Sequence, residues 1–430
     1  MNKYDVVTIG AGVIGCSIAL ALSKRGLRTL NVDSLPAAGY GSTSHSSAII
    51  RPIYSHLTSC AIAHESRFLW QDWQNFLGVV DDRGFAQYTE CGGIVLIREG
   101  EEHLYEDNLS SMSAVGVEYE LLNASEIEKL YPGITLTSFG PPKTLADEKF
   151  GQTSGGKITS AILVPAAGYV SDPQLASHNL QMAAKNHGAD FMFNAPVSTV
   201  ITDKNVAGGV VLKNGDVISS GITINASGPH SSIINQMAGI ADSLKITTRA
   251  VRHEVVYLPA DARHFQMGGR FLVDTDAGFY QRPDGADLLI GTTDPECDGM
   301  NVVNPDHYNA SFTEQWTLQA YRAAQRFPEL GISNTARGTV GLYDVSDDWI
   351  PIYDKSDLGG FYLAIGTSGN QFKNAPLAGE IMAEIIVRDR NGGNHDTEPA
   401  SLHLPHLQRT VGLDFYSRNR TIQATTSVMA

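Results

Sequence analysis

Residues 4–33 read YDVVTIGAGVIGCSIALALSKRGLRTLNVD, and this stretch decides the fold class. Residues 4–9 form a short β-branched run, which is typical of a buried parallel strand. The turn GAGVIG follows at 10–15, and apolar residues then recur at helical spacing over 13–24. A second strand is predicted at 28–32. This order of strand, glycine-rich turn, helix and strand predicts a Rossmann-type dinucleotide-binding unit.

Each glycine of the turn has a physical task in such a unit. Gly10 allows the tight turn, Gly12 lets the backbone approach a pyrophosphate, and Gly15 lets the helix pack closely on the strand. The pyrophosphate is expected at the start of the helix, beside Val13 and Ile14, because free N–H groups and the helix dipole favour an anion there.

Asp33 ends the second predicted strand, where a carboxylate can accept hydrogen bonds from an adenosine ribose. A carboxylate at this place would repel a 2′-phosphate, so the pattern disfavours NADP. Two later segments favour FAD over NAD. Residues 222–230 (ITINASGPH) and 361–373 (FYLAIGTSGNQFK) are each a strand that runs into small residues and glycines. Such strands, far from the first motif, indicate a long cofactor that is contacted by separated parts of the chain.

Composition narrows the class of protein. A chain of 430 residues can hold two domains, and 42% hydrophobic with 18% charged residues is ordinary for a folded protein. The formal net charge of -15 argues against a nucleic-acid partner. The four cysteines are scattered, which fits a reducing compartment. Because no cleavable leader and no long apolar run is evident, we expect a cytoplasmic protein without a transmembrane segment.

Several segments together resemble the D-amino-acid oxidase/sarcosine oxidase family of FAD-dependent amine and amino-acid oxidoreductases, which includes glycine oxidase and the sarcosine and dimethylglycine dehydrogenases. They run in family order over almost the whole chain. The segments are GAGVIG (10–15), STSHSSAIIR (42–51), VPAAGYVSDP (164–173), NASGPHS (225–231), FYQRPDGADLLIG (279–291), RGTVGLYDVSDDWIPI (337–352) and AIGTSGNQFK (364–373).

The resemblance implies an α/β fold in which a Rossmann-type FAD-binding domain is interleaved with an antiparallel-sheet (α+β) substrate domain. The FAD-binding domain is expected to take residues 1–79, 146–226 and 330–394, and the substrate domain residues 80–145 and 227–329. Short strand-like runs at 251–291 agree with an antiparallel sheet. The polar tail at 395–430 receives no function.

Family matching also identifies candidate site residues. Arg51 and Lys373 match cations that bind the substrate carboxylate, and a guanidinium can hold a carboxylate by two parallel hydrogen bonds. Tyr280 and Tyr343 match aromatic walls of the pocket. The residues expected to contact FAD are Gly10, Gly12, Val13, Ile14, Gly15, Asp33, Ser42, Thr43, His45, Ser46, Val197, Ala226, Gly228, Gly366, Gly369, Asn370, Gln371, Phe372 and Lys373.

The chain departs from the family at positions that matter for chemistry. Monomeric sarcosine oxidases carry a flavin-bonded cysteine where this chain has Gly341, and an oxygen-activating lysine where it has Leu289. Without that lysine we expect a dehydrogenase, or a slow oxidase, rather than a fast oxidase. His45 matches a histidine that is bonded to FAD in dimethylglycine and sarcosine dehydrogenases. A covalent bond here is one hypothesis, and a histidine that only lies beside the flavin is the favoured one.

The sequence therefore predicts FAD-dependent oxidation of the C–N bond of a small amino or N-alkyl amino acid. Hydride passes to flavin N5, and the imine product is hydrolysed in water. One alternative is a 2-hydroxy-acid or polyol dehydrogenase, for which His253 is the candidate base. Another is an FAD-binding subunit of a multi-subunit oxidase. Arg282 is a further residue that could reach the pocket, and the substrate, electron acceptor and oligomeric state stay open. His403 and His406 flank a proline, so no metal site is expected.

Overall fold

The glycine-rich unit forms as β1 (Lys3–Ile9), α1 (Val13–Lys24) and β2 (Thr29–Val32) in the computed structural model, which describes residues 3–260 and 269–423. β1 lies inside an eight-stranded sheet and pairs in parallel with β2 on one side and β12 (Val217–Asn225) on the other. The other strands of this sheet are β9 (Asp190–Met192), β10 (Val197–Asp203), β11 (Val206–Leu212), β18 (Ile352–Lys355) and β19 (Phe361–Ile365).

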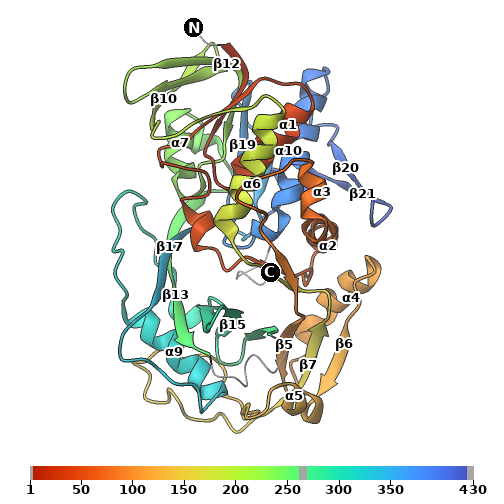
Figure 1. Ribbon diagram of the computed structural model, residues 1–430, viewed down its shortest axis with the longest axis vertical. Coiled ribbons are helices and arrows are strands. Elements are labelled where there is room, and N and C mark those ends of the chain that lie inside the picture. The colour runs from red at the N-terminus through yellow and green to blue at the C-terminus, as the bar shows by residue number, and fades with distance from the viewer. Residues whose placement is uncertain (1–2, 261–268, 424–430) are drawn as a thin grey trace.

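Helices cover the first sheet. α1 packs between α6 (Pro173–Asn186) and α10 (Ala375–Arg390), and Figure 1 shows the three helices side by side near the top of the molecule. Residues 13–23 of α1 are buried all round, which is why this helix is apolar on every face. The remaining helices near this sheet are α2 (Leu57–Gln71), α3 (Trp73–Leu77) and α7 (Ser231–Met237).

A second eight-stranded sheet occupies the lower half of Figure 1. It is antiparallel except where β14 pairs in parallel with β5. Helix α9 (Glu314–Arg326) covers it, and α4 (Glu106–Ala114) and α5 (Ala124–Leu130) lie near its other edge. In sheet order the strands are β17 (Gly338–Ser346), β13 (Thr248–Pro259), β16 (Asp287–Thr292), β15 (Phe279–Asp284), β14 (Phe271–Asp274), β5 (Gly93–Arg98), β7 (Ile158–Val164) and β6 (Glu120–Asn123).

These two sheets confirm the predicted fold class, a Rossmann-type unit joined to an antiparallel-sheet unit. Sheet membership differs from the predicted boundaries at two strands. β7 and β17 belong to the second sheet, although residues 146–226 and 330–394 were assigned to the cofactor domain. β7 is largely apolar and β17 mixes apolar with polar residues, so residue type alone does not assign either strand to a sheet. A third, small sheet has the order β3 (Ile49–Ile50), β8 (Gly168–Val170) and β4 (Tyr88–Glu90).

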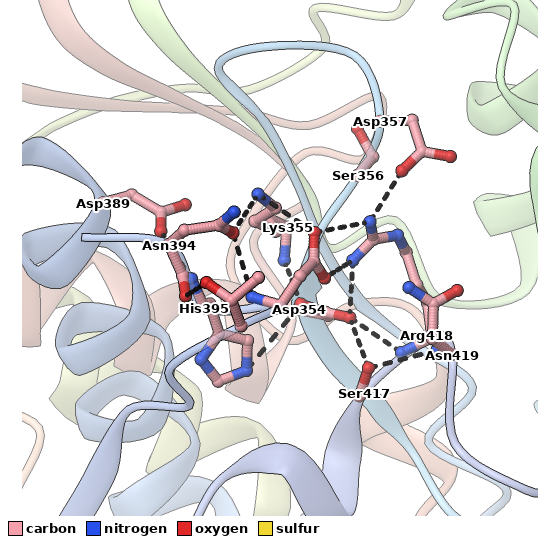
Figure 2. A network of polar contacts seen from close by, with 12 residues as sticks. Asp354, Lys355, Ser356, Asp357, Asp389, Asn394, His395, Ser417, Arg418 and Asn419 are labelled. Atoms are coloured by element: carbon pink, nitrogen blue, oxygen red, sulfur yellow. Dashed lines mark hydrogen bonds and ion pairs between the residues drawn. The ribbon is translucent and has the colours of Figure 1, made fainter. Parts of the chain in front are cut away.

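The tail from residue 395 onward, to which the sequence assigns no function, forms ion pairs with the first sheet. Arg418 is buried and donates to Asp354 of β18 at 3.0 Å, to Asp357 at 2.6 Å and to Asp396 at 2.7 Å (Figure 2). The tail also contains the hairpin of β20 (Ser401–Leu404) and β21 (Arg409–Gly412), and residues 424–430 lie outside the described part. No helix within residues 3–260 and 269–423 has the length and apolar character needed to cross a membrane.

Candidate active site

A cavity of about 540 Å³ lies where the two sheets meet. It is lined by the glycine-rich turn, by the segment at 40–51, by residues of β14, β15 and β17, and by the loop that follows β19. All of the predicted site residues line it except two. Gly15 packs against the turn, where a Cβ would overlap the carbonyl oxygen of Gly10, and Gly366 donates its N–H to Asp344 at 2.6 Å.

One end of the cavity fits the adenosine diphosphate half of FAD. Gly10 lies so close to the end of β12 that a Cβ would overlap the carbonyl oxygen of Ala226. Asp33 accepts the N–H of Ala11 at 2.6 Å, so the carboxylate is fixed beside the turn. Burial raises the pKa of Asp33, although these backbone hydrogen bonds oppose the shift. Thr43 accepts the N–H of Val13 at 3.1 Å, which links the segment at 40–51 to the start of α1.

Ala48 is a left-handed residue within the segment at 40–51. It is buried and has φ +50°, a conformation that costs a residue with a side chain about 1–2 kcal/mol. Its N–H donates to Ser46 Oγ at 3.0 Å and its carbonyl accepts the N–H of Val170 at 2.9 Å. Ala48 lies between His45 and Arg51, and one segment supplies both of these residues to the same cavity.

His45 lies directly against Gly341. A Cβ at 341 would come within 2.9 Å of the Cβ of His45. His45 and a side chain at 341 therefore compete for one place. Burial lowers the pKa of His45, which favours its neutral imidazole. The structure thus brings together two positions that the sequence analysis had treated separately.

Arg51 and Lys373 form a buried cationic pair at the cavity wall. Lys373 Nζ donates to the hydroxyl of Tyr54 at 2.9 Å and to the carbonyl oxygen of Asn370. The guanidinium of Arg51 lies over the ring of Tyr54, 4.8 Å from its centroid. Burial lowers the pKa of Lys373 well below its usual range, and the charge of Arg51 lowers it further. Within the described residues no ion pair involves Lys373, so the wall is suited to an anion that enters the cavity.

Three aromatic rings form the facing walls. Tyr280 and Tyr343 were predicted, and Phe271 was not. Each ring lies flat over a glycine: Phe271 over Gly93, Tyr280 over Gly291 and Tyr343 over Gly369, where in each case a Cβ would overlap the ring. The first two pairs are direct register partners in the second sheet. These glycines set the depth of the rings in the cavity.

The structure also places the remaining candidates. His253 does not line the cavity; it stacks on the ring of Tyr343 with a centroid distance of 4.0 Å, and burial lowers its pKa to about 4. Arg282 and Leu289 are buried beside each other in β15 and β16 and do not line the cavity either. His406 contacts Glu65 at 2.7 Å, whereas His403 contacts Thr410 at 3.4 Å.

Sequence reasoning missed Tyr54 and the residues at the adenosine end that come from the second unit. Pro305, Asp306 and Tyr308 line the cavity there, and Asp306 contacts His230 at 3.0 Å. Their segment has no motif. Tyr54, by contrast, lies only three residues after Arg51, so a search for aromatic residues near that cation could have found it.

The model of a family described as FAD-dependent oxidoreductases matches residues 5–385. The beta subunit of sarcosine oxidase from Rhodobacter capsulatus is 24% identical over 391 residues, covering 90% of this chain and 86% of that protein. Monomeric sarcosine oxidase from an Arthrobacter species is 22% identical, covering 95% and 98%. Among solved structures, L-proline dehydrogenase from P. horikoshii has a TM-score of 0.75 at 23% identity and covers 97% of both chains.

Proposed function

Because the chain belongs to the family of FAD-dependent oxidoreductases, we propose that it oxidises the C–N bond of a small amino or N-alkyl amino acid. The family assignment confirms the predicted cofactor, FAD, and the predicted class of enzyme. The relatives support the substrate class, since several of them are named for sarcosine, proline or glycine.

The observation that carries the proposal is the buried pair of Arg51 and Lys373 beside the flavin-facing segment. Cations that line the wall of a cavity can bind an anion by charge-assisted hydrogen bonds, and a substrate carboxylate is such an anion. The guanidinium can hold both carboxylate oxygens in one plane, which orients the Cα–H of the substrate.

Bound FAD supplies the hydride-accepting centre. The chain's own residues then have the tasks of binding, orienting and excluding water. Arg51 and Lys373 hold the carboxylate, and the rings of Tyr280 and Tyr343 close the pocket around the amine. The hydroxyl of Tyr280 is engaged by Ser47 Oγ at 2.6 Å, so this wall is fixed before substrate enters. The imine formed from the substrate is hydrolysed in water.

Oxidation of a 2-hydroxy acid is less well supported than oxidation of an amino acid. That reaction needs a base at the substrate hydroxyl, and the candidate His253 lies behind Tyr343 instead of in the cavity wall. A role only as an assembly subunit is opposed by the buried cations, because assembly does not require them. Partnership with other subunits remains compatible with the catalytic role, as the name of the Rhodobacter relative indicates.

The electron acceptor is proposed to be something other than oxygen. Leu289 stands where a lysine would stabilise charge on reacting oxygen, and it is buried. FAD is proposed to be held without a covalent bond, with His45 as a neighbour of the flavin. Acid precipitation tests this second point, because yellow colour that stays with the pellet would contradict it.

The function is tested by anaerobic mixing of the purified flavoprotein with amino acids, N-methyl amino acids and 2-hydroxy acids. Bleaching of the flavin by an amino acid, and not by its hydroxy analogue, is expected. Arg51→Ala should then require far more substrate for bleaching and keep its yellow colour. Bleaching by hydroxy acids alone would refute the proposal, and reoxidation by dissolved oxygen at the rate of bleaching would refute the dehydrogenase assignment.

A further inference from the structure

Arg282 lies outside the cavity, yet it holds the segment that carries Arg51. It is 2% exposed on β15, and its Nε donates to the carbonyl oxygen of Ser47 at 2.6 Å. Its Nη1 donates to the carbonyl oxygen of Pro283 at 2.6 Å and to Asp284 at 3.0 Å. The guanidinium group of Arg282 therefore donates through Nη1 to residues of the second sheet and through Nε to the segment at 40–51.

The same guanidinium also supports the strand that leads to Arg51. It lies over the ring of Tyr169, 4.6 Å from the ring centroid. Tyr169 belongs to β8 and is the register partner of Ile49 in β3. Arg282 thus touches the segment directly at Ser47 and, through Tyr169, at the strand that ends just before Arg51.

A second residue of β15 also forms a hydrogen bond with Ser47. Tyr280, two residues before Arg282 on β15, shares a hydrogen bond of 2.6 Å between its hydroxyl and Ser47 Oγ. Residues two apart on a strand point to the same face, so both side chains reach Ser47 from one surface. Backbone and side chain of Ser47 are therefore both anchored to the second sheet.

The next residue, Ala48, is the one with the left-handed backbone at φ +50°. Strained backbone of this kind persists only where the surroundings fix it, and here Arg282 and Tyr280 fix it on one side while β8 fixes it on the other. The turn decides where Arg51 lies relative to His45, because those residues flank it.

We propose that Arg282 is a positioning residue for substrate binding, which holds the turn at Ala48 and thereby places Arg51 for the carboxylate. This inference rests on the proposed function for the nature of the substrate. A lysine could not replace Arg282 in this role, since it lacks the planar group that donates in two directions and stacks on Tyr169.

The test compares Arg282→Met and Arg282→Lys with the wild-type holoprotein. Three quantities are measured. Anaerobic flavin reduction by the amino acid that bleaches the enzyme gives its dissociation constant and the limiting rate, and the perturbation of the flavin spectrum by propionate gives the dissociation constant of propionate. Both dissociation constants should rise together, by about tenfold or more in Arg282→Met. The limiting rate should change much less, and the flavin content should stay the same. Arg282→Lys should resemble Arg282→Met.

A matched control and a rescue separate positioning from general stability. Arg337→Met removes an arginine that pairs with Asp287 beside the second sheet at 2.6 Å, and it should leave both dissociation constants unchanged. Adding Ala48→Gly to Arg282→Met should restore part of the affinity for propionate, because glycine adopts the left-handed turn without strain.

Unchanged dissociation constants in both Arg282 variants would overturn the inference, and so would an equal rise in Arg337→Met. Recovery of the melting temperature without recovery of propionate binding in the double variant would also overturn it. If Arg282→Met does not fold, Arg282→Lys alone decides by the same criteria. Failure of every amino acid to bleach the wild type would refute the proposed function, whereas the propionate measurements would still test the positioning role.

Discussion

Substitution of Lys373 by methionine is the perturbation that the cationic wall makes most informative. The change keeps a long side chain and removes one buried charge. Lys373 is 4% exposed, and its ammonium group donates to Tyr54 at 2.9 Å and lies close enough to Arg51 for their charges to interact. If the ammonium group binds the substrate carboxylate, its loss should weaken binding without removing the cofactor.

The size of the effect follows from the interaction that is lost. A hydrogen bond to a charged group contributes about 1.5–3 kcal/mol. Since about 1.4 kcal/mol corresponds to a factor of ten, the substrate dissociation constant should rise about 10- to 100-fold. The melting temperature should stay the same or rise, because the folded protein no longer buries a cation that lacks a carboxylate partner among the described residues.

The pH dependence provides a second readout. Because burial holds the pKa of Lys373 well below its usual value, the folded state disfavours the charged ammonium group. Stability of the wild type should therefore increase as pH rises through that lowered pKa toward the ordinary lysine value of about 10.4. Binding of the carboxylate needs the charge and should weaken over the same rise. Lys373→Met should show neither change.

The assay is anaerobic flavin reduction over a range of substrate concentrations and pH, with Lys24→Met as the control. Lys24 ends α1, and its ammonium group contacts the carbonyl oxygen of Phe76 at 3.1 Å, away from the cavity. A dissociation constant that stays within twofold of the wild type in Lys373→Met would refute the reasoning. So would an alkaline loss of binding that persists in that variant.

Three further changes probe the cofactor site. Gly341→Ala should lower the flavin-to-protein absorbance ratio, because the new Cβ would lie 2.9 Å from the Cβ of His45; an unchanged ratio and spectrum would contradict this. Burial raises the pKa of Asp344 to about 7, so wild-type stability should fall as pH rises from about 4 to about 7, and Asp344→Asn should flatten this fall in thermal melts; an equal slope would exclude it as the source. Asp306→Ala should speed flavin release after dilution, because it removes the contact with His230; equal release rates would show that this contact does not retain FAD.

Prediction from sequence succeeded where a motif is local. The glycine-rich turn, α1 and Asp33 follow one another within thirty-three residues, so their spacing alone defines their geometry. The same holds for the loop after β19, whose residues from Gly369 to Lys373 line the cavity together. Arg51 was identified by its segment, and the structure places it beside Lys373, but the carboxylate role of both remains a prediction.

Residue types alone could not place side chains that meet across strands. His253 was the candidate base for one alternative reaction, and its place behind Tyr343 depends on the pairing of β13 with β17. β7 and β17 pair within the second sheet, which their residue types do not reveal.

The sequence by itself determined the class of cofactor, the dinucleotide-binding unit and the cations available for a carboxylate, because these depend on residue type and short spacing. Only the tertiary structure decided how the cavity is shaped. Three features depend on register between segments far apart in the chain. They are the packing of the aromatic rings on glycines, the contact of His45 with Gly341, and the hydrogen bond from Arg282 to Ser47. Register follows from packing of the whole core, and no local spacing encodes it.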